Sequence, residues 1–329
     1  MAGFNYGGQA VVEGVMMRGR RSAAVAVRRA SGDILLHEET LDPRLFANRW
    51  LRLPFLRGLL LLWEMLVLGT RMLAFAAAAS LPPDAGTDSK PETLAPVAAA
   101  PATGVPPGAI HDAAAGEVRT LSGPALALTL LFSLSFAVAL FFLTPLAVVR
   151  VARPWVGAGW GSLIAEGVVR LALLVGYLWV IGQFSDVRRV FEYHGAEHKT
   201  INAFEAGQPL DIEHVRAASR VHTRCGTGFL LIVMVVSIFV FAAVGQPPLP
   251  LRVLSRIVLI PVVAAISYEL LRLGAAYYRF RVVRWLVAPG LALQGLTTRE
   301  PHDDQIECAI AALDRVLRRD GVAAQVIPI

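Results

Sequence analysis

Four stretches of this sequence are each apolar over the length that crosses a lipid bilayer, and they restrict the chain to membrane-protein folds. They occupy about residues 124–149, 163–183, 228–244 and 251–273. A membrane-spanning helix needs about 20 mainly apolar residues. The composition agrees, because 55% of the residues are hydrophobic and only 17% are charged, against about 25% in soluble domains. We therefore expect a mainly α, polytopic membrane protein with about four transmembrane helices.

The remaining segments predict smaller parts outside these helices. An alternating pattern at 22–29 and 33–39 around a turn predicts a β-hairpin, and a glycine-rich motif precedes it at 7–19. This motif predicts a strand with turns, the alternative being a ligand-contacting loop. The expected organisation is a soluble N-terminal β unit (1–50), a membrane-associated helix (53–80), a disordered Pro/Ala-rich linker (81–123), a four-helix transmembrane region (124–277) with a His-rich loop (184–227), and a cytoplasmic C-terminal helix region (278–329).

The apolar segment at 53–79 differs from the other four because charges interrupt it at regular intervals. Arg57, Glu64 and Arg71 are seven residues apart, so a helix places them on nearly one face. Such a helix either lies in the membrane interface or packs its charged stripe inside a bundle. We expect a membrane-associated helix that does not simply cross. If it did cross, the 7–19 motif and the His-rich loop would lie on opposite sides.

The C-terminal region predicts an amphipathic helix. Asp303 or Asp304 is placed to cap its first turn. Apolar residues recur at helical spacing, so one face should pack against the rest of the cytoplasmic part. This stripe consists of Ile306, Ala309, Ile310, Leu313, Val316 and Leu317.

Charge and cysteine content indicate how the chain is placed in the cell. The formal net charge is +6, but the basic residues mostly flank apolar segments, as the positive-inside rule describes. This distribution favours a multi-pass protein of the cell membrane with both termini in the cytoplasm. Basic and aromatic residues do not interleave, which argues against nucleic acid as a partner. Two distant cysteines predict free thiols rather than a disulfide framework.

The strongest chemical signal is His194-Gly195-Ala196-Glu197-His198, which has the order H-x-x-E-H. On a helix, side chains four residues apart lie above one another, so the two histidines can hold one metal ion. Glu197 is placed to take a proton from a metal-bound water. The order is the inverse of the H-E-x-x-H metallopeptidase pattern. We expect a divalent transition metal, with zinc the best match to histidine ligands.

A catalytic zinc site normally has three protein ligands and a position for water, so one ligand must come from elsewhere. His222 and Cys225 form an H-x-x-C group just before the third apolar segment. Glu269 lies near the end of the fourth, where it is either functional or paired with Arg272. Cys225 is equally typical of a buried apolar thiol. Asp186 is a weaker candidate, and Glu166 with Arg170 predicts a structural ion pair inside the second segment.

Four motifs in order resemble the YqhQ family of bacterial membrane proteins of unknown function, which are labelled predicted metal-dependent enzymes. These are the 7–19 motif GGQAVVEGVMMRG, YHGAEHK at 193–199, HTRCGT at 222–227 and LTTREP at 296–301. The resemblance covers nearly the whole chain, although the linker is longer than the family leads one to expect. It implies the same membrane topology and supports one site containing Glu13, His194, Glu197, His198, His222 and Cys225.

Three functions follow from these patterns. The first is a hydrolase with a metal on His194, His198 and either His222 or Cys225, and with Glu197 as general base. The second is a non-enzymatic scaffold or assembly factor, in which the loop binds a protein partner and any metal is structural. The third is a metal transporter, in which Glu269 matters more than Glu197. The substrate is not indicated, and a homo-oligomer is compatible with each function.

Overall fold

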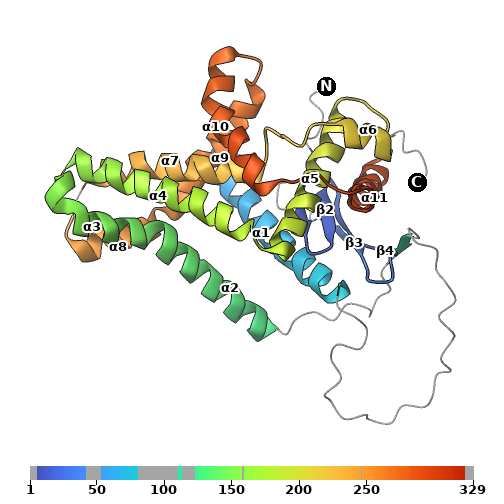
Figure 1. Ribbon diagram of the computed structural model, residues 1–329, viewed down its shortest axis with the longest axis horizontal. Coiled ribbons are helices and arrows are strands. Elements are labelled where there is room, and N and C mark those ends of the chain that lie inside the picture. Colours follow the sequence, from blue (N-terminus) through green and yellow to red (C-terminus); the bar gives the residue numbers. More distant parts are fainter. Residues whose placement is uncertain are drawn as a thin grey trace, which may run out of the picture.

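A computed structural model describes residues 6–41, 53–80, 110–112, 123–157, 159–245 and 247–322. Figure 1 shows two parts beside each other. A small sheet lies with α5, α6 and α11, and longer apolar helices extend away from it. The expected mainly α fold with a small N-terminal sheet is confirmed.

The sheet has five strands in sequence order: β1 (Gly7–Val11), β2 (Gly14–Arg18), β3 (Ser22–Arg28), β4 (Ile34–Thr40) and β5 (Ile110–Asp112). The predicted hairpin is present as β3 and β4, which pair antiparallel. The glycine-rich motif forms a second hairpin, whose turn contains Glu13 with a φ of 54°. β5 pairs parallel to β4. Three residues of the predicted linker therefore belong to the sheet, and most of that segment lies outside the described residues.

Both faces of the sheet are covered, which explains why its strands are apolar on both sides. In β3, Val25 and Val27 pack toward α1 (Leu56–Ala79), while Ala24 and Ala26 pack toward α5 and α11. On the α1 side, Leu68, Met72, Phe75 and Ala76 complete the core. The second half of α1 is therefore a cover for the sheet. Its N-terminal half packs against α9.

Each residue of the charged stripe of α1 has an oppositely charged partner, although the Arg71 side chain is exposed. Arg57 pairs with Glu269 of α9 at 2.5 Å, and Glu64 pairs with Arg18 of β2 at 2.7 Å. Arg71 lies 3.6 Å from Glu39 of β4. By length and apolarity α1 is one of four candidate membrane spans. Whether α1 crosses a membrane stays a prediction; its charged residues form ion pairs with α9 and with the sheet.

The other candidate spans are Ala127–Val156, Trp160–Ile181 and Gly226–Val244. The first is built from α2 (Gly123–Val138), the π-helical turn η3 (Ala139–Leu143) and α3 (Thr144–Val156), and the next two are α4 and α7. The segment predicted as one helix at 251–273 is instead α8 (Leu249–Val258) and α9 (Ile260–Ala276). These two helices are bent by 44° at Leu259, which separates them. Pro261 lies in the first turn of α9, where proline is favoured.

A cluster of charged side chains is buried between the long helices. Glu166 of α4 accepts hydrogen bonds from Arg170 at 2.8 Å and from Arg256 of α8 at 3.1 Å. Arg170 also donates to Ser237 and to the carbonyl oxygen of Phe141, in the π-helical turn. The predicted ion pair between Glu166 and Arg170 is confirmed, with Arg256 as an additional member.

The predicted His-rich loop is largely helical. It contains α5 (Ser185–Glu205) and the short α6 (Ile212–Ala217), and α10 (Arg281–Thr297) and α11 (Asp303–Asp320) follow later. All six apolar positions of the predicted C-terminal stripe are buried against the sheet and α5. The cap differs from the expected aspartates, because His302 forms a capping box with Gln305.

Candidate metal centre

His194 and His198 lie one turn apart on α5 with their rings side by side. The ring centroids are 4.4 Å apart. Residues four apart lie on one face of a helix, which is the geometry that the H-x-x-E-H spacing predicts. His198 is buried and His194 is partly exposed. One side of the pair is therefore within reach of a small molecule.

The other nitrogen of each ring is fixed by a backbone carbonyl. His194 Nδ1 lies 2.8 Å from the carbonyl oxygen of Thr297, and His198 Nδ1 lies 2.6 Å from that of Arg220. A carbonyl only accepts, so each Nδ1 carries a proton, and the neutral form of each ring would present an Nε2 lone pair. Metal-binding histidines in proteins are oriented in this way.

Cys225 brings the third donor from a different part of the chain. It caps α7, and its Sγ accepts a hydrogen bond from the amide of Thr227. Its Sγ lies 3.3 Å from His194 Nε2, and one ligand atom from each of His194, His198 and Cys225 lies within 4.8 Å of the others. Tetrahedral zinc with bonds of about 2.0–2.3 Å separates its ligands by about 3.4–3.7 Å. The three side chains fit such an ion with little movement.

His222 lies beside this group. Its ring centroid is 5.6 Å from that of His198. Gln294 of α10 holds its backbone from both sides, accepting from the amide at 3.0 Å and donating to the carbonyl at 2.7 Å. The Nε2 atom of His222 is buried, makes no hydrogen bond within the described structure, and lies 3.7 Å from a Glu205 oxygen. Burial lowers the pKa of His222, which favours a neutral ring.

Glu197 is buried on the flank of α5 that faces β1. Its Oε1 accepts a hydrogen bond of 3.1 Å from the amide of Gly8. Burial raises the pKa of this carboxyl group, while the neighbouring His194 acts in the opposite direction. A Cβ at Gly8 would come within 3.1 Å of Glu197 Cγ and 2.4 Å of the Met16 carbonyl oxygen. The glycine-rich hairpin therefore needs a glycine at the point where it touches the H-x-x-E-H motif.

Gly195, between the two histidines in sequence, lets another segment run along α5. The amide of Arg299 donates to the carbonyl oxygen of Phe191 at 2.9 Å. A Cβ at Gly195 would lie 2.0 Å from the Arg299 carbonyl oxygen. This close approach places Thr297, two residues earlier, against His194. The LTTREP motif thus orients a ligand through its backbone.

The segment that holds His198 is itself held by two side chains of α5. Asn202 donates to the carbonyl oxygens of Ser219 and Val221, which flank Arg220. Lys199 donates to the carbonyl oxygens of Arg216 and Ala218. None of Asn202, Lys199, Gln294 and Thr297 was a predicted site residue, although Lys199 and Thr297 lie within the YHGAEHK and LTTREP motifs. For Asn202 the available signal was its spacing, since it lies one turn after His198.

Other candidate residues lie elsewhere. Glu13 forms an ion pair with Arg189, and Glu269 is paired with Arg57. Arg272, the expected partner of Glu269, is more distant at 3.9 Å. Asp186 lies in the first turn of α5, and the His214 ring contacts Asp211. The described structure therefore brings His194, His198 and Cys225 together, with His222 beside them, while Glu197 on the same helix is hydrogen-bonded to Gly8 of β1.

The comparisons with known proteins identify a family, but its description names no activity. Residues 53–319 match the family described as "Protein of unknown function (DUF1385)". The chain is 36% identical to the "Uncharacterized protein YqhQ" of Bacillus subtilis (strain 168) over 327 residues, which is 97% of this chain and 94% of that protein. Neither description names a metal, a reaction or a partner. No solved structure matches the chain. The protein is thus a member of the DUF1385 family, to which its four motifs and its nearly complete alignment with YqhQ assign it.

Proposed function

We propose that this protein is a membrane-embedded hydrolase that uses a divalent metal, zinc being the best fit, on His194, His198 and Cys225. One observation carries the proposal. Three lone-pair donors from two distant segments converge, while the remaining nitrogen of each histidine is held by a carbonyl. Three protein ligands with a fourth position for water are typical of catalytic rather than structural zinc.

The chemistry follows from the residues around this position. His194, His198 and Cys225 would hold the metal, which when bound would supply a water of lowered pKa and polarise the bond to be cleaved. Glu197, which accepts a hydrogen bond from the Gly8 amide, would accept one proton from this water and return it to the leaving group. The hydroxyl oxygen would form a new bond to the carbonyl or phosphoryl centre, and the bond to the leaving group would break with its electron pair. Water is thereby divided between the two products.

The charge distribution supports a cytoplasmic orientation for the site. α4 ends at Ile181 and α7 begins at Gly226, so two candidate spans meet the metal centre at the same membrane face. Basic residues gather around this face, and positive charge is typical of the cytoplasmic side. They include Arg188, Arg189, Lys199, Arg216, Arg220, Arg224, Arg279, Arg281 and Arg284. On this basis the protein belongs in the cell membrane with both termini in the cytoplasm.

The first test is elemental analysis of detergent-purified protein after zinc loading and dialysis. We expect about one zinc per chain in the wild type, and loss of the metal in His194→Ala and His198→Ala. His214→Ala is the matched control, because its ring contacts Asp211 and not the centre. Full zinc content in all three variants would overturn the metal site.

The second test separates binding from hydrolysis. Glu197→Gln should retain zinc and lose turnover of p-nitrophenyl esters or phosphodiesters by about 100-fold or more. Wild-type protein with zinc but without turnover above the Glu197→Gln level on these probes would contradict the hydrolase and favour a structural metal.

A structural metal is the second candidate function, and His222 is the observation that favours it. Its buried Nε2 makes no hydrogen bond within the described structure, and its ring lies next to His198. If His222 turned toward the centre, four ligands would close the site and exclude water. His222→Ala distinguishes the two arrangements. Zinc affinity falls steeply if His222 is a ligand, whereas a three-ligand site retains its metal.

A further inference from the structure

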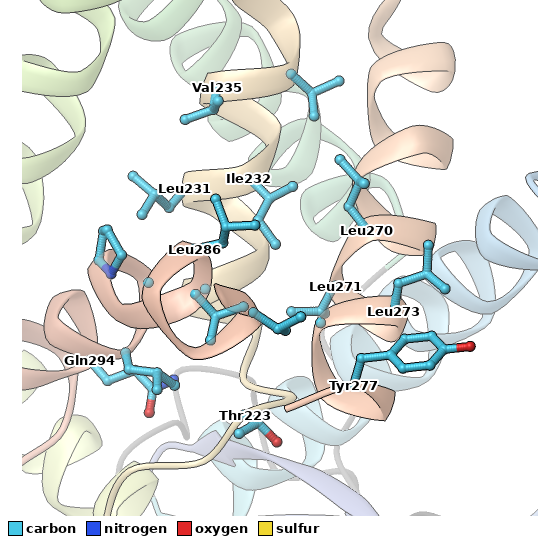
Figure 2. A pocket seen from close by; sticks show the side chains of 18 of the residues that line it. Thr223, Leu231, Ile232, Val235, Leu270, Leu271, Leu273, Tyr277, Leu286 and Gln294 are labelled. Carbon is cyan, nitrogen blue, oxygen red and sulfur yellow. The ribbon is translucent and has the colours of Figure 1, made fainter. Parts of the chain in front are cut away.

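An apolar pocket of about 530 Å³ lies between α7, α9 and α10. Its size is within the range of about 300–1,000 Å³ that small-molecule sites occupy. Figure 2 shows Leu231, Ile232 and Val235 of α7 facing it across from Leu270 and Leu271 of α9. Several lining side chains are also exposed, including Leu286 at 75% and Leu273 at 49%. The pocket is therefore open to its surroundings beside α9 and α10, where its lining side chains are exposed.

One end of this pocket is polar. Figure 2 shows Thr223, Tyr277 and Gln294 toward one end and Val235 toward the other. Gln294 is the residue that holds the backbone of His222. Thr223 stands in the sequence between His222 and the metal-ligand candidate Cys225. The polar end of the pocket thus adjoins the metal centre.

The edge of the pocket near Tyr277 and Phe280 is basic. Arg279 lies over the ring of Phe280, with its guanidinium carbon 4.8 Å from the ring centroid. Arg281 and Arg284 follow in the first turn of α10 and are exposed. In the described part of the chain none of these three arginines has an acidic partner. An anionic group at this edge would meet uncompensated positive charge.

We propose that this pocket binds the hydrocarbon chain of an anionic amphiphile and presents its polar end to the metal centre. The proposal rests on the proposed function and names the substrate class of that site. Between Gly228 and Val236 the pocket follows α7 for eight residues, or about 12 Å at 1.5 Å per residue. A shape that is long, apolar and polar at one end fits an acyl chain better than a peptide, whose amide groups would be buried without partners.

Photocrosslinking in lipid nanodiscs tests this pocket. Three diazirine probes are used separately: phosphatidylglycerol and phosphatidylcholine, each labelled on the acyl chain, and palmitate. We expect the anionic probes to label α7 and α10 peptides more than phosphatidylcholine does. Labelling by phosphatidylglycerol alone identifies a phospholipid, and labelling by palmitate alone identifies a free fatty anion. Equal labelling by all three would overturn the anionic preference.

Two variants fill the pocket from opposite ends. Gly228 lines it, and a Cβ there meets nothing within 4 Å, so Gly228→Leu projects into open space. Val235→Trp fills the far end. Each should reduce labelling about fivefold or more. Gly176→Leu is the matched control, since Gly176 of α4 has the same open surroundings outside the pocket. Unchanged labelling in both filled variants would overturn the pocket.

Zinc content measured on the same samples separates this proposal from the proposed function. His194→Ala should lose zinc and keep lipid labelling. Val235→Trp should keep zinc and lose lipid labelling. Labelling without zinc in the wild type would support the pocket and refute the metal site. Zinc without pocket-dependent labelling would refute the pocket and leave the metal site standing.

Discussion

Two groups of buried polar side chains lie in different parts of this protein, and they differ in how their atoms are satisfied. Between the long helices, Glu166 accepts hydrogen bonds of 2.8–3.1 Å from both Arg170 and Arg256, while Arg256 Nη1 has no hydrogen-bond partner within the described residues. Between α5 and the start of α7, one possible ligand atom from each of His194, His198 and Cys225 lies within 4.8 Å of the others. Opposite charges stabilise the first group without a ligand. The second group has no opposite charge of its own, and a cation that joined it would replace the weak contact between the Cys225 thiol and His194 Nε2 with stronger bonds.

Removing Glu166 should give the largest loss of stability. Glu166→Ala leaves two buried guanidinium groups uncompensated, and breaking such a pair costs about 3–5 kcal/mol. We expect the same destabilisation with and without zinc, measured as thermal or SDS unfolding in detergent micelles. Ala165→Gly, at the neighbouring α4 position, is a control for helix propensity alone. A stability loss that depended on zinc would contradict the separation of the two groups.

Removing a histidine should affect stability more strongly when metal is present, because without metal only its packing and its hydrogen bond to a carbonyl are lost. A ligand that binds the folded state alone, at 1,000 times its Kd, adds about 4 kcal/mol. Wild-type protein should therefore unfold at a higher temperature after zinc loading, and His198→Ala should not respond to zinc. In EDTA the variant should unfold within a few degrees of the wild type. An equal response to zinc in both proteins would show that the metal binds elsewhere.

The sequence predicted the parts of the centre that depend on local spacing. His194 and His198 needed only the helical period, and Cys225 could be proposed because it borders an apolar segment. The stripe of the C-terminal helix, buried as predicted, also follows from the helical period. These patterns are contained within a few turns of chain.

The partners of Glu13 and Glu269 could not be predicted, because they are distant in sequence. Glu13 pairs with Arg189, 176 positions later, and Glu269 pairs with Arg57, 212 positions earlier. Sequence spacing suggested Arg272 as the partner of Glu269. In the structure Glu269 pairs more closely with Arg57 of α1. Backbone contacts, such as the Thr297 carbonyl on His194, involve no side chain and leave little trace in residue type.

Loosening the support of the centre should have an intermediate effect. Asn202→Ala removes two hydrogen bonds to the segment whose Arg220 carbonyl orients His198. Outer contacts of this kind typically change metal affinity by about 10–100-fold. We expect weaker zinc binding in competition with a fluorescent chelator, with little change in the stability of the metal-free protein. Asn202→Asp should not restore affinity, because a carboxylate cannot donate to the two carbonyls. Wild-type affinity in Asn202→Ala would show that the segment is rigid without this contact.

The two cysteines provide the test with the smallest expected effect. Cys225 belongs to the group of possible metal ligands, whereas Cys308 does not. Cys308 is buried in α11 against the sheet, and burial raises its pKa to about 12. Its neutral thiol stabilises the fold fully below the unfolded pKa of about 9, and this contribution is lost as the pH rises toward 12. At pH 10 the cost is about 1.4 kcal/mol. Cys308→Ala should therefore lose less stability than the wild type between pH 8 and pH 10, with zinc content unchanged. Cys225→Ala should do the opposite, losing zinc while keeping the alkaline sensitivity of the wild type. If both variants lost zinc, zinc binding would depend on the buried Cys308 thiol as well as on Cys225. That result would contradict the distinction between the two cysteines.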